Sequence, residues 1–181
     1  PGSFYQVNPI QAQKLYEKAI ELADLSGKET VVDAYCGTGT IGMIAAKKAG
    51  KVFGVESNPD AVRDAVGNAK ANDVKYFRFY REDAVHFLQS CAADNMPVDV
   101  VLMDPPRAGS SEEFLDAVAK IGPKRVVYVS CNPTTLERDC TYLEKQGYRA
   151  KEVWPVDMFP WSGAVEAVCL LEKNKKARIH G

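Results

Sequence analysis

Apolar residues along the chain fall into two recurring patterns. Short runs rich in β-branched and aromatic residues are typical of buried strands, and they occupy residues 30–33, 51–56, 75–80, 98–103, 124–130, 148–156 and 164–171. Longer segments, with apolar residues at every third or fourth position, predict helices over 10–25, 40–48, 59–72, 82–91, 110–121 and 134–146. We therefore expect one domain over 1–181, with a lead-in and first helix at 1–27, a core at 28–173 and a frayed tail at 174–181.

The order of these segments predicts an α/β fold. One helix comes first, strands and helices then alternate, and two strands follow each other at the end. Such alternation is typical of a Rossmann-like, mostly parallel sheet with helices on both faces. The last two strands are joined by residues 157–163, which are too few for a parallel crossover. We therefore expect a seven-stranded sheet with one antiparallel strand.

A glycine-rich turn follows the first predicted strand. Gly37 and Gly39 separate this strand from a helix of small residues, and glycine lets the backbone turn sharply and approach a ligand closely. The helix start offers free N–H groups. In a right-handed βαβ unit both strand ends open into one crevice, so Glu56, at the end of the next strand, is placed to bind a ribose. The stretch predicts a pocket for an adenosine-containing cofactor.

Two kinds of cofactor fit this pocket. Gly37, Gly39 and Gly42 satisfy G-x-G-x-x-G, and Glu56 lies at about the spacing of a ribose-binding acid. This pattern is typical of a nicotinamide or flavin dinucleotide. Asp33, just before the turn, instead favours a cationic ligand over a pyrophosphate. S-adenosylmethionine carries a sulfonium and an ammonium group, so the acid favours it, but the glycine pattern leaves both cofactors open.

Acidic residues stand at two later junctions. Asp83 lies between a strand and a helix, placed either to bind an adenine amino group or to stabilise the helix start. Asp104 ends a buried strand and precedes two prolines, so it is either a turn former or a crevice residue. In open α/β sheets ligands bind at the carboxyl ends of the strands, and this rule favours the crevice.

Cys131 and Glu166 are the remaining candidates for chemistry. Cys131 ends the fifth strand and precedes Asn132 and Pro133, which are typical of a helix start. A helix N-terminus lowers the pKa of a thiol below the ordinary ~8.5 and creates a nucleophile, whereas the alternative is a small buried residue. Glu166, early in the last strand, is either an edge acid facing solvent or a desolvated base in the crevice.

Composition narrows the class of protein. The 181 residues are 46% hydrophobic and 26% charged, as in soluble globular proteins. No apolar run approaches the ~20 residues of a membrane span, and no signal peptide opens the chain. Five cysteines without C-x-x-C spacing and only two histidines argue for reduced thiols in the cytoplasm and against a metal site. The net charge of -1 lacks the basic excess of a stand-alone nucleic-acid binder.

Five motifs, in order, resemble those of the bacterial RNA 5-methyluridine methyltransferases. Phe4–Asn8 resembles the lead-in F-x-Q-x-N, and Asp33–Gly39 resembles the cofactor loop D-x-Y-C-G-x-G. Asp104–Arg107 and Ser130–Pro133 match the next two motifs, and residues 155–166 resemble the stretch that carries the catalytic glutamate. The resemblance implies the catalytic domain of a class I methyltransferase, which uses S-adenosylmethionine and releases S-adenosylhomocysteine.

The resemblance also implies roles for single residues. Cys131 is the nucleophile, Glu166 is the base that removes the C5 proton, and Asp104 lies close to the target base. Together with the residues already singled out at the glycine turn, the positions expected to bind the cofactor are Gln6, Asp33, Tyr35, Gly37, Gly39, Thr40, Glu56, Asp83 and Asp104. Trp161–Ala164 stands where the family usually has histidines.

The implied activity is methyl transfer to C5 of a uridine in RNA through a covalent bond between Cys131 and C6. We expect ribosomal RNA rather than transfer RNA. The family carries an N-terminal RNA-binding region that this sequence lacks, so RNA is expected to bind with its help, and the enzyme is expected to be a cytoplasmic monomer. Two alternatives remain open. One is methylation of another RNA position or of an amino group, because Asp-Pro-Pro also resembles the motif of amino-group methyltransferases; the other is a dinucleotide-dependent oxidoreductase.

Overall fold

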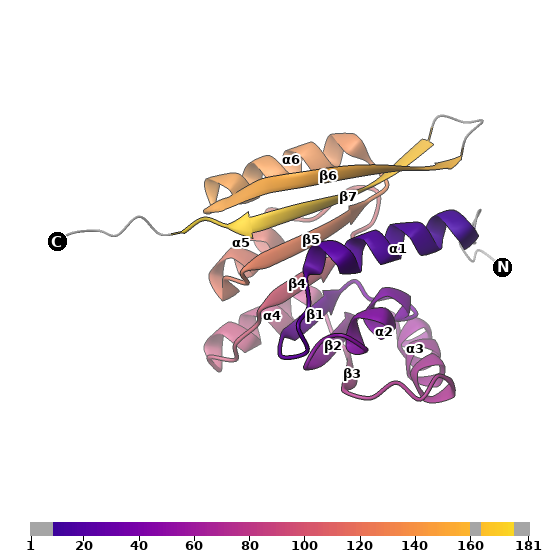
Figure 1. The fold of residues 1–181 in the computed structure, drawn as a ribbon. Coiled ribbons are helices and arrows are strands. Elements are labelled where there is room, and N and C mark those ends of the chain that lie inside the picture. Colours follow the sequence, from indigo (N-terminus) through magenta and orange to yellow (C-terminus); the bar gives the residue numbers. More distant parts are fainter. Residues whose placement is uncertain (1–8, 160–163, 176–181) are drawn as a thin grey trace.

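Strands and helices alternate along the chain, as the apolar pattern predicts (Figure 1). The computed structural model describes residues 9–159 and 164–175. Its helices are α1 (Pro9–Ala23), α2 (Thr40–Ala46), α3 (Pro59–Ala71), α4 (Ala84–Ala93), α5 (Glu112–Ile121) and α6 (Pro133–Lys145). Its strands are β1 (Thr30–Ala34), β2 (Lys51–Glu56), β3 (Phe77–Arg81), β4 (Val100–Met103), β5 (Arg125–Ser130), β6 (Tyr148–Phe159) and β7 (Ala164–Lys173).

Within the described residues, the strands form a seven-stranded sheet in the order β3-β2-β1-β4-β5-β7-β6. The strands β1 to β5 pair in parallel. The last strand, β7, runs antiparallel to both β5 and β6. The predicted sheet with one antiparallel strand is therefore confirmed. The strand order reverses between β1 and β4, which opens a crevice at their carboxyl ends.

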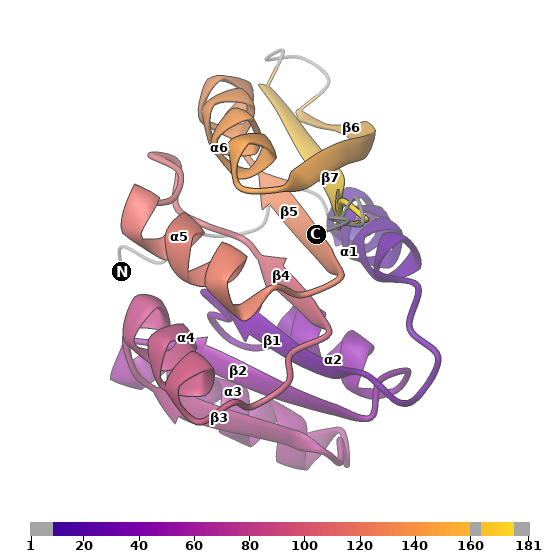
Figure 2. The ribbon, with the colours of Figure 1, turned by 90° about the vertical axis from the view of Figure 1, so that its left-hand side faces the viewer.

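Helices cover both faces of the sheet (Figure 2). One apolar cluster joins the sheet to α4, α5 and α6 and includes the fully buried Phe114. The other joins it to α1 and α2 and includes Leu15. Neighbouring residues of one strand enter opposite clusters, as Val126 and Val127 of β5 do. Because both faces are covered, the central strands are apolar throughout rather than alternating.

Several element boundaries differ from the sequence predictions. Strand β3 begins at Phe77 rather than residue 75, because Tyr76 has a left-handed φ of 62°. Strand β6 continues through the expected connector to Phe159, and it can include Pro155 because an edge strand tolerates a missing donor. Directly after β7, the Asn174 N–H donates to the Gly147 carbonyl at 2.8 Å.

Side-chain caps fix the helix starts next to the strand ends. Asn58, Asp83, Ser111 and Asn132 each accept a hydrogen bond from a backbone N–H in the first turn of α3, α4, α5 and α6, respectively. Such caps hold the junctions at which the candidate site residues stand.

Candidate active site

Four polar residues stand at one edge of the sheet and share one face of it. By strand alternation, each lies two positions from a buried residue of the cluster beneath α1 and α2. The polar residues are Asp33, Asp104, Cys131 and Glu166, and the buried ones are Val31, Leu102, Val129 and Val168. The sequence prediction that these strand ends face one crevice agrees with this placement.

Tyr16 of α1 is affected by three of the acids at these strand ends. Its side chain is half-buried against the α1–α2 cluster. Burial raises its pKa, and the charges of Asp104, Glu166 and Asp33 raise it further. A phenol influenced by all three acids must lie near them, so Tyr16 belongs to the site. Sequence reasoning missed it, because helical spacing gave no reason to separate it from the other residues of α1.

The glycine-rich turn has the backbone geometry that its composition predicts. Tyr35, Gly37 and Gly39 all have positive φ, of 59°, 54° and 84°. The Gly37 N–H donates to Glu56 Oε1 at 3.0 Å, and Glu56 Oε2 accepts from the Asn58 N–H at 2.9 Å. Glu56 therefore ties the turn to the end of β2. Thr40 is exposed as the first residue of α2.

Asp33 was expected to face the crevice, but it is closed off from solvent. Its side chain is fully buried. Among the described residues its carboxylate oxygens have no partner at full hydrogen-bond geometry, although the nearby Gly42 N–H acts to lower its pKa. Burial, followed by the charge of Asp104, raises its pKa well above the usual range. The cause is close packing of the turn: a Cβ on Gly42 would lie 2.6 Å from Asp33 Oδ2 and would also overlap the Phe77 ring. Gly42 thus allows the helix to approach the strand.

A cavity of about 220 Å³ brings together three of the predicted cofactor residues. Tyr35, Glu56 and Asp83 all line it, with Pro106 and Gly109 on the side of the Asp104 motif. Asp83 also caps α4, because its Oδ1 accepts from the Val85 and His86 N–H groups at 2.8 Å and 3.2 Å. The structural role predicted for Asp83 is confirmed, and its place in the cavity leaves the ligand role open.

Cys131 lies directly before α6 in a tight turn. Ser130 Oγ accepts from the Asn132 N–H at 3.0 Å, and Asn132 caps the helix. Burial and the charge of Glu166 raise the pKa of the Cys131 thiol, whereas Arg107 lowers it. The prediction of a lowered thiol pKa is therefore wrong for this structure. Neighbouring carboxylates and burial outweigh the helix start and the one nearby guanidinium.

The two acids beside Cys131 are shifted in the same direction. Burial raises the pKa of Glu166, and Arg107 partly opposes this, so the expected raised pKa is confirmed. Asp104 is accessible to solvent, but surrounding protein and the charge of Glu166 raise its pKa above the usual range. Arg107 is therefore the cation that acts on both Cys131 and Glu166. The sequence showed it within Asp-Pro-Pro-Arg, but nothing there indicated which groups it would face.

Some expectations concern residues that the structure does not describe or that lie elsewhere. Gln6 and Trp161 lie outside the described residues. The four cysteines expected to be buried, Cys36, Cys91, Cys140 and Cys169, are buried. Within 9–159 and 164–175, no group of three His, Cys, Asp or Glu residues could hold a metal ion. No helix in the same ranges is long and apolar enough to cross a membrane.

Comparison with known proteins decides the family. The family model described as tRNA (Uracil-5-)-methyltransferase matches residues 1–174. The chain belongs to this family. An uncharacterized RNA methyltransferase of Caldanaerobacter subterraneus is 52% identical over 173 residues, which are 96% of this chain and 38% of that protein. One from Listeria monocytogenes is 48% identical over 172 residues, again 38% of its length. The chain thus spans well under half of these relatives.

Solved structures of the family and of the wider class I fold agree with this architecture. The tRNA (uracil-54, C5)-methyltransferase of Pyrococcus abyssi, solved with S-adenosyl-L-homocysteine, is 36% identical with a TM-score of 0.78. The match covers 94% of this chain and 40% of that one. Precorrin-6y C5,15-methyltransferase of Geobacter metallireducens is 18% identical with a TM-score of 0.73 over 89% of each chain, a likeness of fold. The predicted class I methyltransferase fold is confirmed.

Proposed function

We propose that this chain is the catalytic domain of an enzyme that transfers a methyl group from S-adenosylmethionine to C5 of a uridine in RNA. The observation that carries the proposal is the meeting of Cys131 and Glu166 at the ends of β5 and β7, beside Asp104 and Arg107. A thiol and a carboxylate with a raised pKa are the two groups that methylation of a uracil carbon requires.

The first pocket in this proposal holds the methyl donor. Glu56 ends β2 and lines the 220 Å³ cavity with Tyr35 and Asp83, so its carboxylate is placed to bind the ribose hydroxyls. Asp83 is placed toward the adenine amino group. Asp33 is a buried acid next to the glycine turn whose pKa is raised by burial, and a cationic ligand bound beside it would favour its charged form. Gly37, Gly39, Thr40 and Gln6 complete the proposed pocket. When bound, S-adenosylmethionine supplies the methyl group.

The chemistry assigned to this chain has three steps. The Cys131 thiolate adds to C6 of the uracil, which moves electron density onto C5 and lets that carbon accept the methyl group. Glu166 then takes the C5 proton. The electron pair left on C5 restores the double bond as the Sγ–C6 bond breaks, and Cys131 leaves as a thiolate. Arg107 favours the thiolate form at the start, since it lowers the pKa of Cys131.

The proposed chemistry identifies the target as a uridine in RNA, but it does not identify which RNA carries that uridine. A uridine inside a helix or loop must leave its stack before C6 can reach the half-buried thiol of Cys131. The P. abyssi relative is described as acting on tRNA, whereas the sequence resemblance favoured ribosomal RNA, so both are candidates here. We also propose a monomeric cytoplasmic enzyme that binds RNA with the help of a region outside residues 1–181. Mapping of 5-methyluridine in RNA from cells that lack the gene identifies the target.

The test of this function is the substitution Cys131→Ala in the complete gene product. Methylation of RNA from cells lacking the gene should be abolished, while S-adenosylmethionine binding by calorimetry should stay within about twofold. Methylation at the wild-type rate would exclude the uracil-C5 mechanism and favour transfer to an amino group, which needs no thiol. Tight binding of NAD in the same calorimetry would favour the oxidoreductase alternative.

A further inference from the structure

The segment that carries Asp104 and Arg107 has little backbone support of its own. Residues 104–111, here called the 104–111 loop, are neither helix nor strand. Besides the bonds of regular helices and strands, its described internal backbone hydrogen bond is the one from the Gly109 N–H to the Pro106 carbonyl at 2.8 Å. Something outside the loop must therefore hold Arg107 in place.

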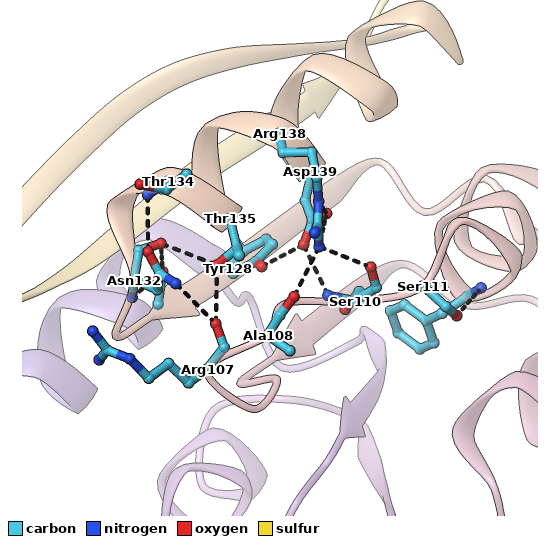
Figure 3. Close-up of polar contacts among 12 residues, drawn as sticks. Arg107, Ala108, Ser110, Ser111, Tyr128, Asn132, Thr134, Thr135, Arg138 and Asp139 are labelled. Carbon is cyan, nitrogen blue, oxygen red and sulfur yellow. Dashed lines mark hydrogen bonds and ion pairs between the residues drawn. The ribbon is translucent and has the colours of Figure 1, made fainter.

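Two neighbouring side chains of α6 hold the loop (Figure 3). Arg138 Nη2 donates to the carbonyl of Ala108 at 2.9 Å and to that of Ser110 at 3.2 Å. Asp139 Oδ2 accepts from the Ser110 N–H at 2.9 Å. Asp139 Oδ1 forms an ion pair with Arg138 Nη2 at 3.0 Å. The pair thus binds both donor and acceptor groups of the loop backbone.

Asp139 is a buried carboxylate with its hydrogen bonds satisfied. It is 1% exposed, and its Oδ2 also accepts from the Tyr128 hydroxyl at 2.6 Å. A buried charge is costly unless it is paired and hydrogen-bonded, and Arg138, Ser110 and Tyr128 meet that requirement. Gly109 leaves room for it, because a Cβ there would lie 2.8 Å from Asp139 Oδ2. The loop backbone can therefore approach the Asp139 carboxylate closely because residue 109 is a glycine.

The first turn of the same helix holds Arg107 itself. Asn132 Nδ2 and Thr135 Oγ1 both donate to the Arg107 carbonyl, at 3.1 Å and 3.3 Å. In return, Arg107 Nη1 donates to the carbonyl of Cys131 at 3.4 Å. Figure 3 shows these contacts leading from Asn132 to Asp139 along one side of α6. The nucleophile and its neighbouring cation are thus fixed to one helix.

We propose that Arg138 and Asp139 are positioning residues that hold the 104–111 loop on α6 and so keep Arg107 beside Cys131. The proposal rests on the role assigned to Cys131 above. Its consequence is electrostatic. Glu166 from β7 and Asp104 from the loop raise the pKa of Cys131, and Arg107 opposes them. If the anchor is lost, Arg107 moves away and the thiol becomes harder to ionise.

The rate at which iodoacetamide alkylates Cys131 in the complete protein, measured against pH, tests this consequence. A Cys131→Ala sample gives the background from the four buried thiols. Arg107→Ala should move the midpoint of the profile to higher pH, because a nearby positive charge favours the thiolate, and Arg138→Ala and Asp139→Asn should move it in the same direction. Asp116→Asn is the matched control, because Asp116 ties α5 to Tyr142 of α6 at 2.7 Å without touching the loop. Its midpoint should not move.

A purely structural role would lower the melting temperature of Arg138→Ala and leave its midpoint unchanged, and that result would overturn the proposal. So would an unchanged midpoint in Arg107→Ala. If Asp139→Asn does not fold, Arg138→Ala decides, since the Arg138 side chain is 56% exposed. Failure of the proposed function has a different signature, which is RNA methylation by Cys131→Ala.

Discussion

Cys131 and Glu166 stand one step beyond the last register pair of β5 and β7, in which Ser130 faces Ala167. Opposed residues on antiparallel strands have Cβ atoms about 4.5–5.5 Å apart, so continuation of the register makes the thiol and the carboxylate neighbours on the same face of the sheet. The two groups also interact, because the charge of Glu166 raises the pKa of Cys131.

This interaction predicts a shift in thiol reactivity. In Glu166→Gln the opposing charge is gone, so the pKa of Cys131 should fall and its alkylation profile should move to lower pH. Iodoacetamide alkylation followed by mass spectrometry measures the shift. Glu172→Gln, at the other end of β7, is the control and should leave the profile unchanged. An equal shift in both variants would mean that Glu166 does not face the thiol.

Asp33 predicts a pH-dependent stability. Its pKa is raised in the folded protein. The contribution of the protonated side chain to the free energy of unfolding is therefore fully present below the unfolded pKa of about 3.9, and it is lost as pH rises through the folded pKa. Asp33→Asn cannot ionise and should therefore be more stable than wild type at pH 7, by about 1–3 kcal/mol. The difference should shrink toward pH 4.

Denaturant melts of both proteins from pH 4 to pH 8 measure that difference. Asp64→Asn, an exposed carboxylate of α3, should show no such trend. A gap between Asp33→Asn and wild type that does not change with pH would show that Asp33 is ionised in the folded protein, against the burial argument.

Glu56 predicts a loss of cofactor affinity. In the proposed pocket its carboxylate binds the ribose hydroxyls, so Glu56→Ala should weaken S-adenosylhomocysteine binding by about 1.5–3 kcal/mol, the value of a hydrogen bond to a charged group. Isothermal titration calorimetry gives the number directly. Because Glu56 also holds the Gly37 N–H, Glu56→Gln should retain part of the affinity. Affinity unchanged in both variants would place the donor elsewhere.

Gly42 and Gly67 form a matched pair for the packing of the glycine turn. A Cβ on Gly42 would overlap Phe77 and Asp33, whereas a Cβ on Gly67 of α3 meets nothing within 4 Å. Gly42→Ala should therefore destabilise the fold by about 1–3 kcal/mol, and Gly67→Ala should stabilise it by about 0.4–1 kcal/mol. Melting curves of the two variants test this. Equal stability of the two variants would show that the glycine turn accommodates the extra methyl group without cost.

The sequence was sufficient for features that depend on local order. Valine-rich runs predicted the strands, and the Asn132-Pro133 pair marked a helix start that the Asn132 cap confirms. Features that depend on distant partners were missed. Burial and Glu166 on another strand raise the pKa of Cys131. Asp33 and Phe77, which come from β1 and β3, both lie close to Gly42 at the glycine turn.

Arg107 and Asp139 show the same limit on a smaller scale. Both stand in recognisable stretches of the sequence, but their partners come from the folding of the 104–111 loop onto α6. A loop with little internal hydrogen bonding takes its conformation from the helix on which it packs, so local spacing could not predict what these side chains contact.

The covalent step is the central claim, and Glu166→Gln tests it most directly. In the complete protein, with S-adenosylmethionine and RNA from cells lacking the gene, this variant should add Cys131 to C6 and transfer the methyl group, but it should fail to remove the C5 proton. A protein–RNA adduct should then accumulate, survive denaturing electrophoresis and carry one methyl group by mass spectrometry. The double variant Cys131→Ala, Glu166→Gln should form none. Normal turnover by Glu166→Gln without any adduct would contradict the account.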